Sequence, residues 1–321
     1  MSIKRLVATI PLLALAACSE DTGECVGHLC ASDVKITDPE GGNLLFEYIY
    51  FDTELQAAFK LPSGVTTLNR VMAYFLNSQT PDANPLPEAG KCNNFVTTKG
   101  WPMFTGTPHE DLDVGTLSIS GKNRAGNDVT FDIPKMPKGI DSIGRPHDAF
   151  YQLLHPNADD NLQFNSSYTV NIGGNGTVAP ATLTDALFLS ADFTVTMPGL
   201  EGNGPMKASS DFTVKWNPVE SSNLPQGSEV LGVTWLVDAA GTPTHICPVN
   251  HSDGTFTIPA SAIAEYRAIA TARGLNPNKI ILLRNAIVHQ LSLLPTTLPN
   301  NKRRVDMVTV NCWAQLMDVT Q

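Results

Sequence analysis

The chain has 321 residues and a formal net charge of −10, and 42% of its residues are hydrophobic. This apolar fraction excludes a wholly disordered chain, and the length suffices for two domains of ordinary size. An acidic surface repels phosphate groups, so the charge argues against nucleic-acid binding. Only 16% of the residues are charged, while Gly (24) and Pro (23) are plentiful. Such a composition favours short strands separated by turns, and hence a mainly β fold.

The first 18 residues combine a positive start, an apolar run and a cysteine. Lys4 and Arg5 precede an apolar run at residues 6–15, which is too short to span a membrane as a helix. The run ends in Leu15-Ala16-Ala17-Cys18, which resembles the lipobox of bacterial lipoproteins. The alternative is an ordinary signal peptide that happens to end near a cysteine.

The lipobox resemblance implies a processed and lipid-anchored protein. Residues 1–17 would be a signal peptide that is cut before Cys18. The Cys18 thiol would carry diacylglycerol, and the new amino group an acyl chain such as palmitate. Because several acyl chains are buried together, such an anchor is effectively permanent.

The residues after Cys18 bear on where the protein lies. Ser19 stands where an Asp favours inner-membrane retention in Gram-negative lipoproteins, so the resemblance implies the bacterial outer membrane, on its periplasmic or cell-surface face. Residues 18–33 are polar and acidic with little hydrophobic periodicity, and we expect them to form a flexible tether.

Strand patterns fill the first half of the folded part. Residues 44–51 are dense in aromatic and β-branched side chains, and turns rich in Gly and Pro follow them. Further strands are expected at residues 70–76, 116–120, 129–133 and 168–172. The run Gly173-Gly174-Asn175-Gly176 is the best internal boundary, which places a first domain at residues 34–176 and a second at residues 177–321.

The second half repeats the strand pattern and adds one helix. Strands are expected at residues 186–196, 211–216, 230–237, 244–249, 255–258, 279–283, 286–291 and 305–313. The alternative for residues 279–283 and 286–291 is helix. A short helix is predicted over residues 259–273, because Ile263 and Tyr266 share one face, Pro259 suits the first turn and Gly274 suits the end. The basic run Lys302-Arg303-Arg304 is interpreted as a solvated hairpin tip.

These elements predict two tandem antiparallel β-sandwich domains, of which the second carries the helix. The pattern resembles the immunoglobulin-like modules of bacterial surface lipoproteins. The Cys…Trp…Cys core spacing of true immunoglobulin domains is absent from the sequence.

Five cysteines follow Cys18, and outside the cytoplasm they are expected to oxidise. Cys25 and Cys30 are close enough to close a small loop. Cys247 and Cys312 both fall in expected strands of the second domain and would staple it, which leaves Cys92 over. The sequence leaves the connectivity open.

Two clusters have the residue types of a copper or zinc site. One is His245, Cys247 and His251, and the other is Cys25-x-x-His28-x-Cys30. The alternative is oxidised cysteines beside surface histidines.

Acidic loop residues suggest a calcium site in the first domain. The oxygen donors in question are Glu110, Asp111, Asp113, Asn157, Asp159, Asp160 and Asn161. Solvated acidic loops are the alternative.

The common catalytic motifs do not occur in the sequence. The one polar group that invites a catalytic interpretation is Arg145, His147 and Asp148, which could act as anion clamp, base and orienting carboxylate. Its alternative is a structural polar corner.

The sequence thus predicts a non-enzymatic envelope lipoprotein that acts as a binding, adhesion or structural module for a protein or polysaccharide ligand. One alternative is a hydrolase of an envelope or extracellular polymer. Another is a metal carrier or a calcium-stabilised structural protein.

Overall fold

A long hairpin near the end of the chain is the centre of the fold. It consists of β21 (Lys279–Pro295) and β22 (Lys302–Thr320), which pair over their whole length. The connection between them places Asn300 and Asn301 at positive φ angles of 75° and 44°, a region that asparagine adopts more readily than most residues. The computed structural model describes residues 25–26, 29–30, 39–59, 64–78, 90–94, 110–140, 146–156, 162–198, 204–225 and 228–321.

The basic run beside this turn is not a solvated tip. Arg303 and Arg304 lie inside β22 and are 4% and 1% exposed. The guanidinium of Arg303 donates hydrogen bonds to Asn77 Oδ1 and to the carbonyl oxygen of Pro299. These acceptors lie outside the run itself, so its composition alone gave no sign of them.

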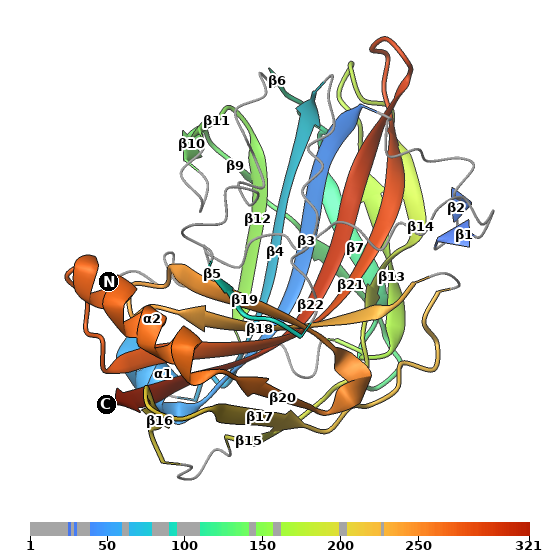
Figure 1. The fold of residues 1–321 in the computed structure, drawn as a ribbon. Helices are drawn as coiled ribbons and strands as arrows, with labels where there is room; N and C mark the ends of the chain where they lie inside the picture. Colours follow the sequence, from blue (N-terminus) through green and yellow to red (C-terminus); the bar gives the residue numbers. More distant parts are fainter. Residues whose placement is uncertain are drawn as a thin grey trace.

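The hairpin lies in the middle of an 11-stranded sheet (Figure 1). In spatial order its main path is β5 (Asn93–Asn94), β19 (Pro243–Asn250), β18 (Val230–Val237), β21, β22, β3 (Glu40–Phe51), β4 (Thr67–Asn77), β12 (Phe150–Pro156) and β9 (Lys135–Met136). Two short strands lie off this path, β16 (Met206–Lys207) beside β22 and β6 (Glu110–Asp111) beside β4. The sheet twists so strongly that β18 and β19 run across the view while β3 and β4 run up it.

The remaining strands form smaller sheets. One is four-stranded, in the order β14 (Ala181–Leu189), β13 (Ser166–Ile172), β7 (Leu117–Lys122) and β8 (Asp128–Asp132). A three-stranded sheet contains β15 (Val195–Met197), β17 (Phe212–Trp216) and β20 (Thr255–Ile258). Two hairpins complete the list, β1 (Cys25–Val26) with β2 (Leu29–Cys30) and β10 (Gly139–Ile140) with β11 (Pro146–His147).

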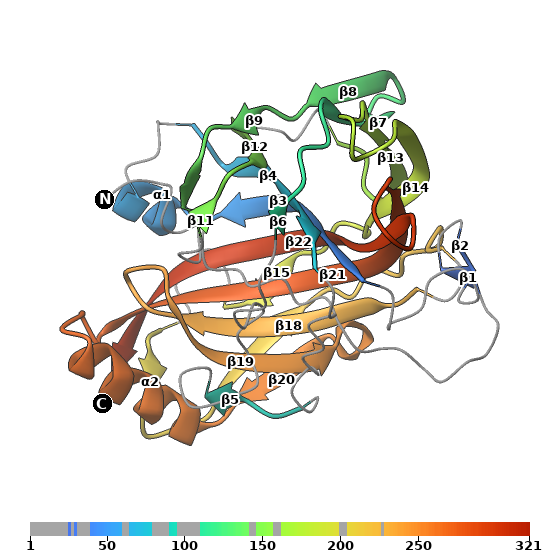
Figure 2. The same ribbon diagram turned by 90° about the horizontal axis from the view of Figure 1, so that it is seen from above.

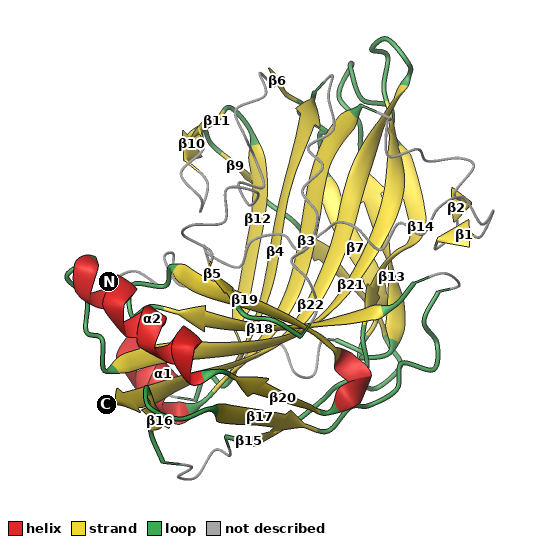
Figure 3. Cartoon of the chain, in the orientation of Figure 1, coloured by secondary structure: helices red, strands yellow, loops and turns green. Residues whose placement is uncertain are grey.

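Helices are few in the described residues, and strands dominate: 57% is strand and 10% is helix. This confirms the predicted mainly β class, and the stacked sheets agree with a β-sandwich. The predicted helix is α2 (Ala260–Ala272), which ends before Gly274 at φ 68°. Two other short helices were not predicted, α1 (Thr53–Phe59) and the 3₁₀ helix η3 (His251–Asp253). Both α-helices lie at the same end of the large sheet (Figure 3).

The boundary predicted between residues 176 and 177 does not separate the sheets. Strands β3 and β4 come from the predicted first domain, and β18, β19, β21 and β22 come from the second, yet they are hydrogen-bonded in one sheet (Figure 2). The join is the parallel pairing of β22 with β3, whereas the other neighbours along the main path are antiparallel. Parallel partners need a long connection, so no turn signal in the sequence marks them.

Both faces of the large sheet are covered, which gives three hydrophobic clusters. Phe46 and Val71 face the four-stranded sheet, in what we call the sandwich core. Leu45 and Val310 lie on the opposite face, in the inner core. The three-stranded sheet and α2 pack against β18, β19, β21 and β22. Their contact forms the third cluster, the helix core, which contains Trp216. Because side chains on both faces of β3 are buried, its sequence shows little alternation between apolar and polar residues.

Tyr168 makes several contacts within the sandwich core. Its ring packs edge to face on Phe46 at a centroid distance of 5.2 Å. Its hydroxyl accepts a hydrogen bond from Gln163 N (2.8 Å) and lies 3.0 Å from the carbonyl oxygen of Gln163. This contact is similar to the tyrosine corner of immunoglobulin-like sandwiches.

A buried ion pair crosses the inner-core face of the sheet. Glu47 of β3 and Arg70 of β4 are register partners, are 0% and 1% exposed, and are hydrogen-bonded. Burial opposes both charges, raising the pKa of Glu47 and lowering that of Arg70, while their mutual attraction offsets this. Each of the two charges is therefore tolerated in the core only while the other is present.

Replacing one partner tests this. The substitution Arg70→Met leaves a buried carboxylate without its cation, and it should lower the free energy of unfolding by about 3–5 kcal/mol in urea titrations. The double variant Glu47→Leu/Arg70→Met should regain most of the loss. As a control, Lys122→Ala removes the exposed partner of Asp128 and should cost less than about 1 kcal/mol. An Arg70→Met protein as stable as wild type would contradict the role of the pair.

Candidate functional site

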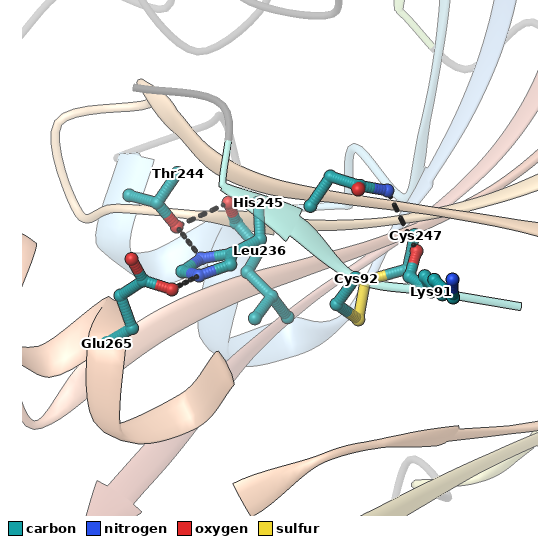
Figure 4. Close-up of a disulfide and its surroundings, with 8 residues drawn as sticks. Lys91, Cys92, Leu236, Thr244, His245, Cys247 and Glu265 are labelled. Atoms are coloured by element: carbon teal, nitrogen blue, oxygen red, sulfur yellow. Dashed lines mark hydrogen bonds and ion pairs between the residues drawn. A yellow bond between two sulfur atoms is a disulfide. The ribbon is translucent and has the colours of Figure 1, made fainter. Parts of the chain in front are cut away.

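Polar and sulfur-containing side chains lie close together where β19, β5 and α2 meet, a place that we call the β19 junction (Figure 4). Strand β5 pairs with the outer edge of β19, with Asn94 opposite His245 and Asn93 opposite Ile246. Just before β5, Gly90 N donates a hydrogen bond to the carbonyl oxygen of Pro248 (2.8 Å). A two-residue strand thus closes the end of the large sheet, which blunts an otherwise exposed edge.

A disulfide fixes this short strand. Cys92 is bonded to Cys247 with an S–S distance of 2.08 Å, across a sequence separation of 155 residues. The predicted pair of Cys247 with Cys312 is therefore wrong. Strands β18 and β21 lie between the strands that carry these two cysteines. Three steps of about 4.8 Å make about 14 Å, beyond the reach of a disulfide.

The unpaired cysteine is Cys312 rather than Cys92. In the part of the chain that the structure describes, Cys312 is the free cysteine, and it is fully buried in the inner core. Burial raises the pKa of its thiol well above the ordinary value, so the thiol is uncharged and inert. Cys25 and Cys30 are register partners in the β1–β2 hairpin; their side chains, like His28 and the Cys18 anchor, lie outside the described residues.

His245 links the sheet to α2. Its ring is 1% exposed, with Nδ1 3.1 Å from Thr244 Oγ1 and Nε2 3.2 Å from Glu265 Oε2. Glu265 also accepts a hydrogen bond from Asn94 Nδ2. That bond, together with His245, lowers the pKa of Glu265, whereas burial lowers the pKa of His245.

The order hydroxyl, imidazole, carboxylate is that of a catalytic relay, but the hydroxyl is not placed for attack. Thr244 is 0% exposed, and its Oγ1 donates a hydrogen bond to the carbonyl oxygen of Leu236 at 2.9 Å. A substrate carbon would need to reach that oxygen. The Thr244–His245–Glu265 arrangement therefore holds α2 and β5 against β19.

The predicted metal cluster is not formed. Cys247 uses its sulfur in the disulfide, and His245 is engaged by Thr244 and Glu265. His251 lies in η3, where its Nδ1 accepts a hydrogen bond from Arg284 Nη2 (3.1 Å). Among the described residues, no three ligand side chains are grouped to hold a metal ion.

The predicted calcium donors are used differently. Glu110 and Asp111 form strand β6 against β4. The carboxylate of Asp113 accepts hydrogen bonds from Lys135 Nζ (2.6 Å) and Asn175 Nδ2 (2.7 Å). Although burial would raise it, these and other hydrogen bonds lower the pKa of Asp113 to about 2. Residues 157–161, which contain the other predicted donors, lie outside the described residues.

The predicted polar site is described only in part. Arg145 lies outside the described residues, and so does the side chain of His147, whose backbone belongs to β11. Asp148 is exposed and pairs with Lys138 Nζ. The structure thus gives Asp148 a cationic partner that the sequence analysis did not name.

The sequence alone did not identify several residues of the β19 junction. Glu265 lies on the polar face of α2, where nothing in the sequence separates it from other solvated carboxylates. The odd number of cysteines after Cys18 indicated that one of them is left over, but it gave no sign of which one, and Cys92 was chosen.

No protein-family model matches this chain, and neither curated proteins nor solved structures provide a match. What the fold and the junction define is a class, a mainly β protein of several stacked sheets with a disulfide-closed sheet edge.

The disulfide should contribute strongly to stability. Cys92→Ser should lower the free energy of unfolding by about 4–5 kcal/mol, because a long loop is no longer closed in the unfolded chain. Urea unfolding with and without reductant measures this. Wild type should respond to reductant, and the control Cys312→Ala should respond equally. A wild type indifferent to reductant would contradict the assigned bond.

Histidine burial should make stability fall in acid. Burial, with the charge of Arg284, lowers the pKa of His251 from 6.5 to about 4. Between these values the unfolded chain binds more protons, so the free energy of unfolding should drop as the pH falls from about 6.5 to about 4, by about 3 kcal/mol. Thermal unfolding across this range should show the drop for wild type and for His289→Gln, and a smaller drop for His251→Gln. Equal slopes in all three would exclude His251 as the source.

Proposed function

We propose that this protein is a lipid-anchored component of the bacterial cell envelope, attached through Cys18 at the outer membrane. Its β-rich body acts as a non-enzymatic binding or structural module. The observation that carries the proposal is the Cys92–Cys247 disulfide. Structural disulfides persist in oxidising compartments such as the periplasm and the cell surface, so this bond supports export independently of residues 1–18.

The anchor is proposed to be the lipid itself. No helix among the described residues has the length and apolar character needed to cross a membrane. The lipobox residues Leu15-Ala16-Ala17-Cys18 supply the expected attachment point, and residues 18–33 supply the expected tether.

The polar groups at the sheet edge make hydrogen bonds that hold the fold together, which supports a binding or structural role over a catalytic one. The arrangement closest to a catalytic relay uses its hydroxyl on a backbone carbonyl, and its imidazole and carboxylate hold α2 and β5 against β19. Such contacts stiffen a scaffold. We propose that the scaffold presents its surface to a protein or polysaccharide of the envelope.

Blocking lipidation tests the proposal. The wild-type protein, expressed in a Gram-negative host, should partition into detergent, and its intact mass should correspond to a chain that starts at Cys18 and carries acyl groups. Cys18→Ser should lack the acyl mass and remain in the aqueous phase. Cys312→Ser, which also removes a thiol, should behave as wild type. A Cys18→Ser protein that matured and partitioned normally would refute the anchor.

A further inference from the structure

A buried cation in the helix core has no carboxylate partner among the described residues. Arg284 lies in the middle of β21 and is 0% exposed. Its guanidinium carbon is 3.9 Å from the centroid of the Trp216 ring and 5.7 Å from that of Phe193. A glycine on the neighbouring strand leaves room for it, since a Cβ at Gly232 would lie 2.7 Å from Arg284 Nη2.

The hydrogen-bond partners of this guanidinium are neutral. Nη1 donates to the carbonyl oxygen of Asn285, and Nη2 donates to His251 Nδ1. His251 has a pKa of about 4 and Cys312 a raised pKa, so both are uncharged near neutral pH. Within the described residues, Arg284 forms no ion pair with a carboxylate. Burial lowers the pKa of Arg284 to about 9, which still leaves it charged at pH 7.

Two donors on paired residues of neighbouring strands lack hydrogen-bond acceptors. Arg284 Nε and Thr234 Oγ1 have no hydrogen-bond partner among the described residues, and both side chains are 0% exposed. Thr234 and Arg284 are register partners in the antiparallel strands β18 and β21. Such partners point to the same face of a sheet with their Cβ atoms about 4.5–5.5 Å apart.

We propose that a small monovalent anion, of the size and charge of chloride, binds between Arg284 Nε and the Thr234 hydroxyl. A buried charge without a partner is costly, and so is each donor without an acceptor. One monoanion offsets the charge and accepts from both donors. A multiply charged oxyanion would exceed the single positive charge available, and the surrounding aromatic rings would not solvate the excess.

Two measurements on the purified full-length protein test the site without any variant. Crystals soaked in sodium bromide should show an anomalous peak in contact with Arg284 Nε and Thr234 Oγ1. Replacing sodium gluconate by sodium chloride at constant ionic strength should raise the Tm, by about 2–4 °C per tenfold rise in chloride. Gluconate is a monoanion that is too large for a closed core, so it controls for screening.

Matched valine variants locate the effect. Thr234→Val keeps the shape of the side chain but removes the hydroxyl, and it should abolish the chloride-specific Tm shift. Thr67→Val is the control, because Thr67 is also fully buried and its hydroxyl has no partner among the described residues, but it lies on β4, which β22 and β3 separate from β21. It should keep the shift. The proposal is overturned by bromide absent from this position, by equal Tm responses of wild type to the two salts, or by a full shift in Thr234→Val.

Discussion

The parallel pairing of β22 with β3 is the constraint on which the rest of the structure depends. It joins strands from opposite ends of the chain, from Arg304 beside Glu40 to Ala314 beside Phe51. The approach is so close at its start that a Cβ on Gly41 would lie 2.2 Å from Arg303 Cβ. Gly42 follows at φ 116°, where a Cβ would lie 2.1 Å from the carbonyl oxygen of Tyr74, so larger residues are excluded at both positions.

This pairing explains why charge is buried on both faces of one sheet. Its parallel register brings β3 and β4 beside the hairpin, and the side chains of these strands, with Leu55 of α1, then form the inner core. Arg70 then faces the inner core and Arg284 the helix core. The two arginines are handled differently, since Arg70 has a carboxylate partner whereas Arg284 has aromatic rings and neutral acceptors. Buried charges of this kind contribute little net stability, because their desolvation offsets the attraction that they gain.

The large sheet also has an edge, at β19, that must be closed. The disulfide and the link from His245 to Glu265 close an edge that would otherwise offer unpaired backbone groups. They draw on residues from β19 and α2, which are near each other in the chain, and from the distant segment around β5. A closed, stiffened edge suits a body that is proposed to stand outside the cytoplasm on a flexible tether.

The sequence by itself determined the elements that depend on local signals. The expected strands at residues 230–237 and 255–258 coincide with β18 and β20, and the helix expected at residues 259–273 is α2. Alternation, strand-forming residues and a terminal glycine are properties of neighbouring residues, so they can be read directly. Only the tertiary structure decided that Cys92 meets Cys247, that Arg303 is buried, and that β3 joins β22. Those outcomes depend on which distant segments come together, and hydrophobic patterning makes each strand apolar without specifying its partner.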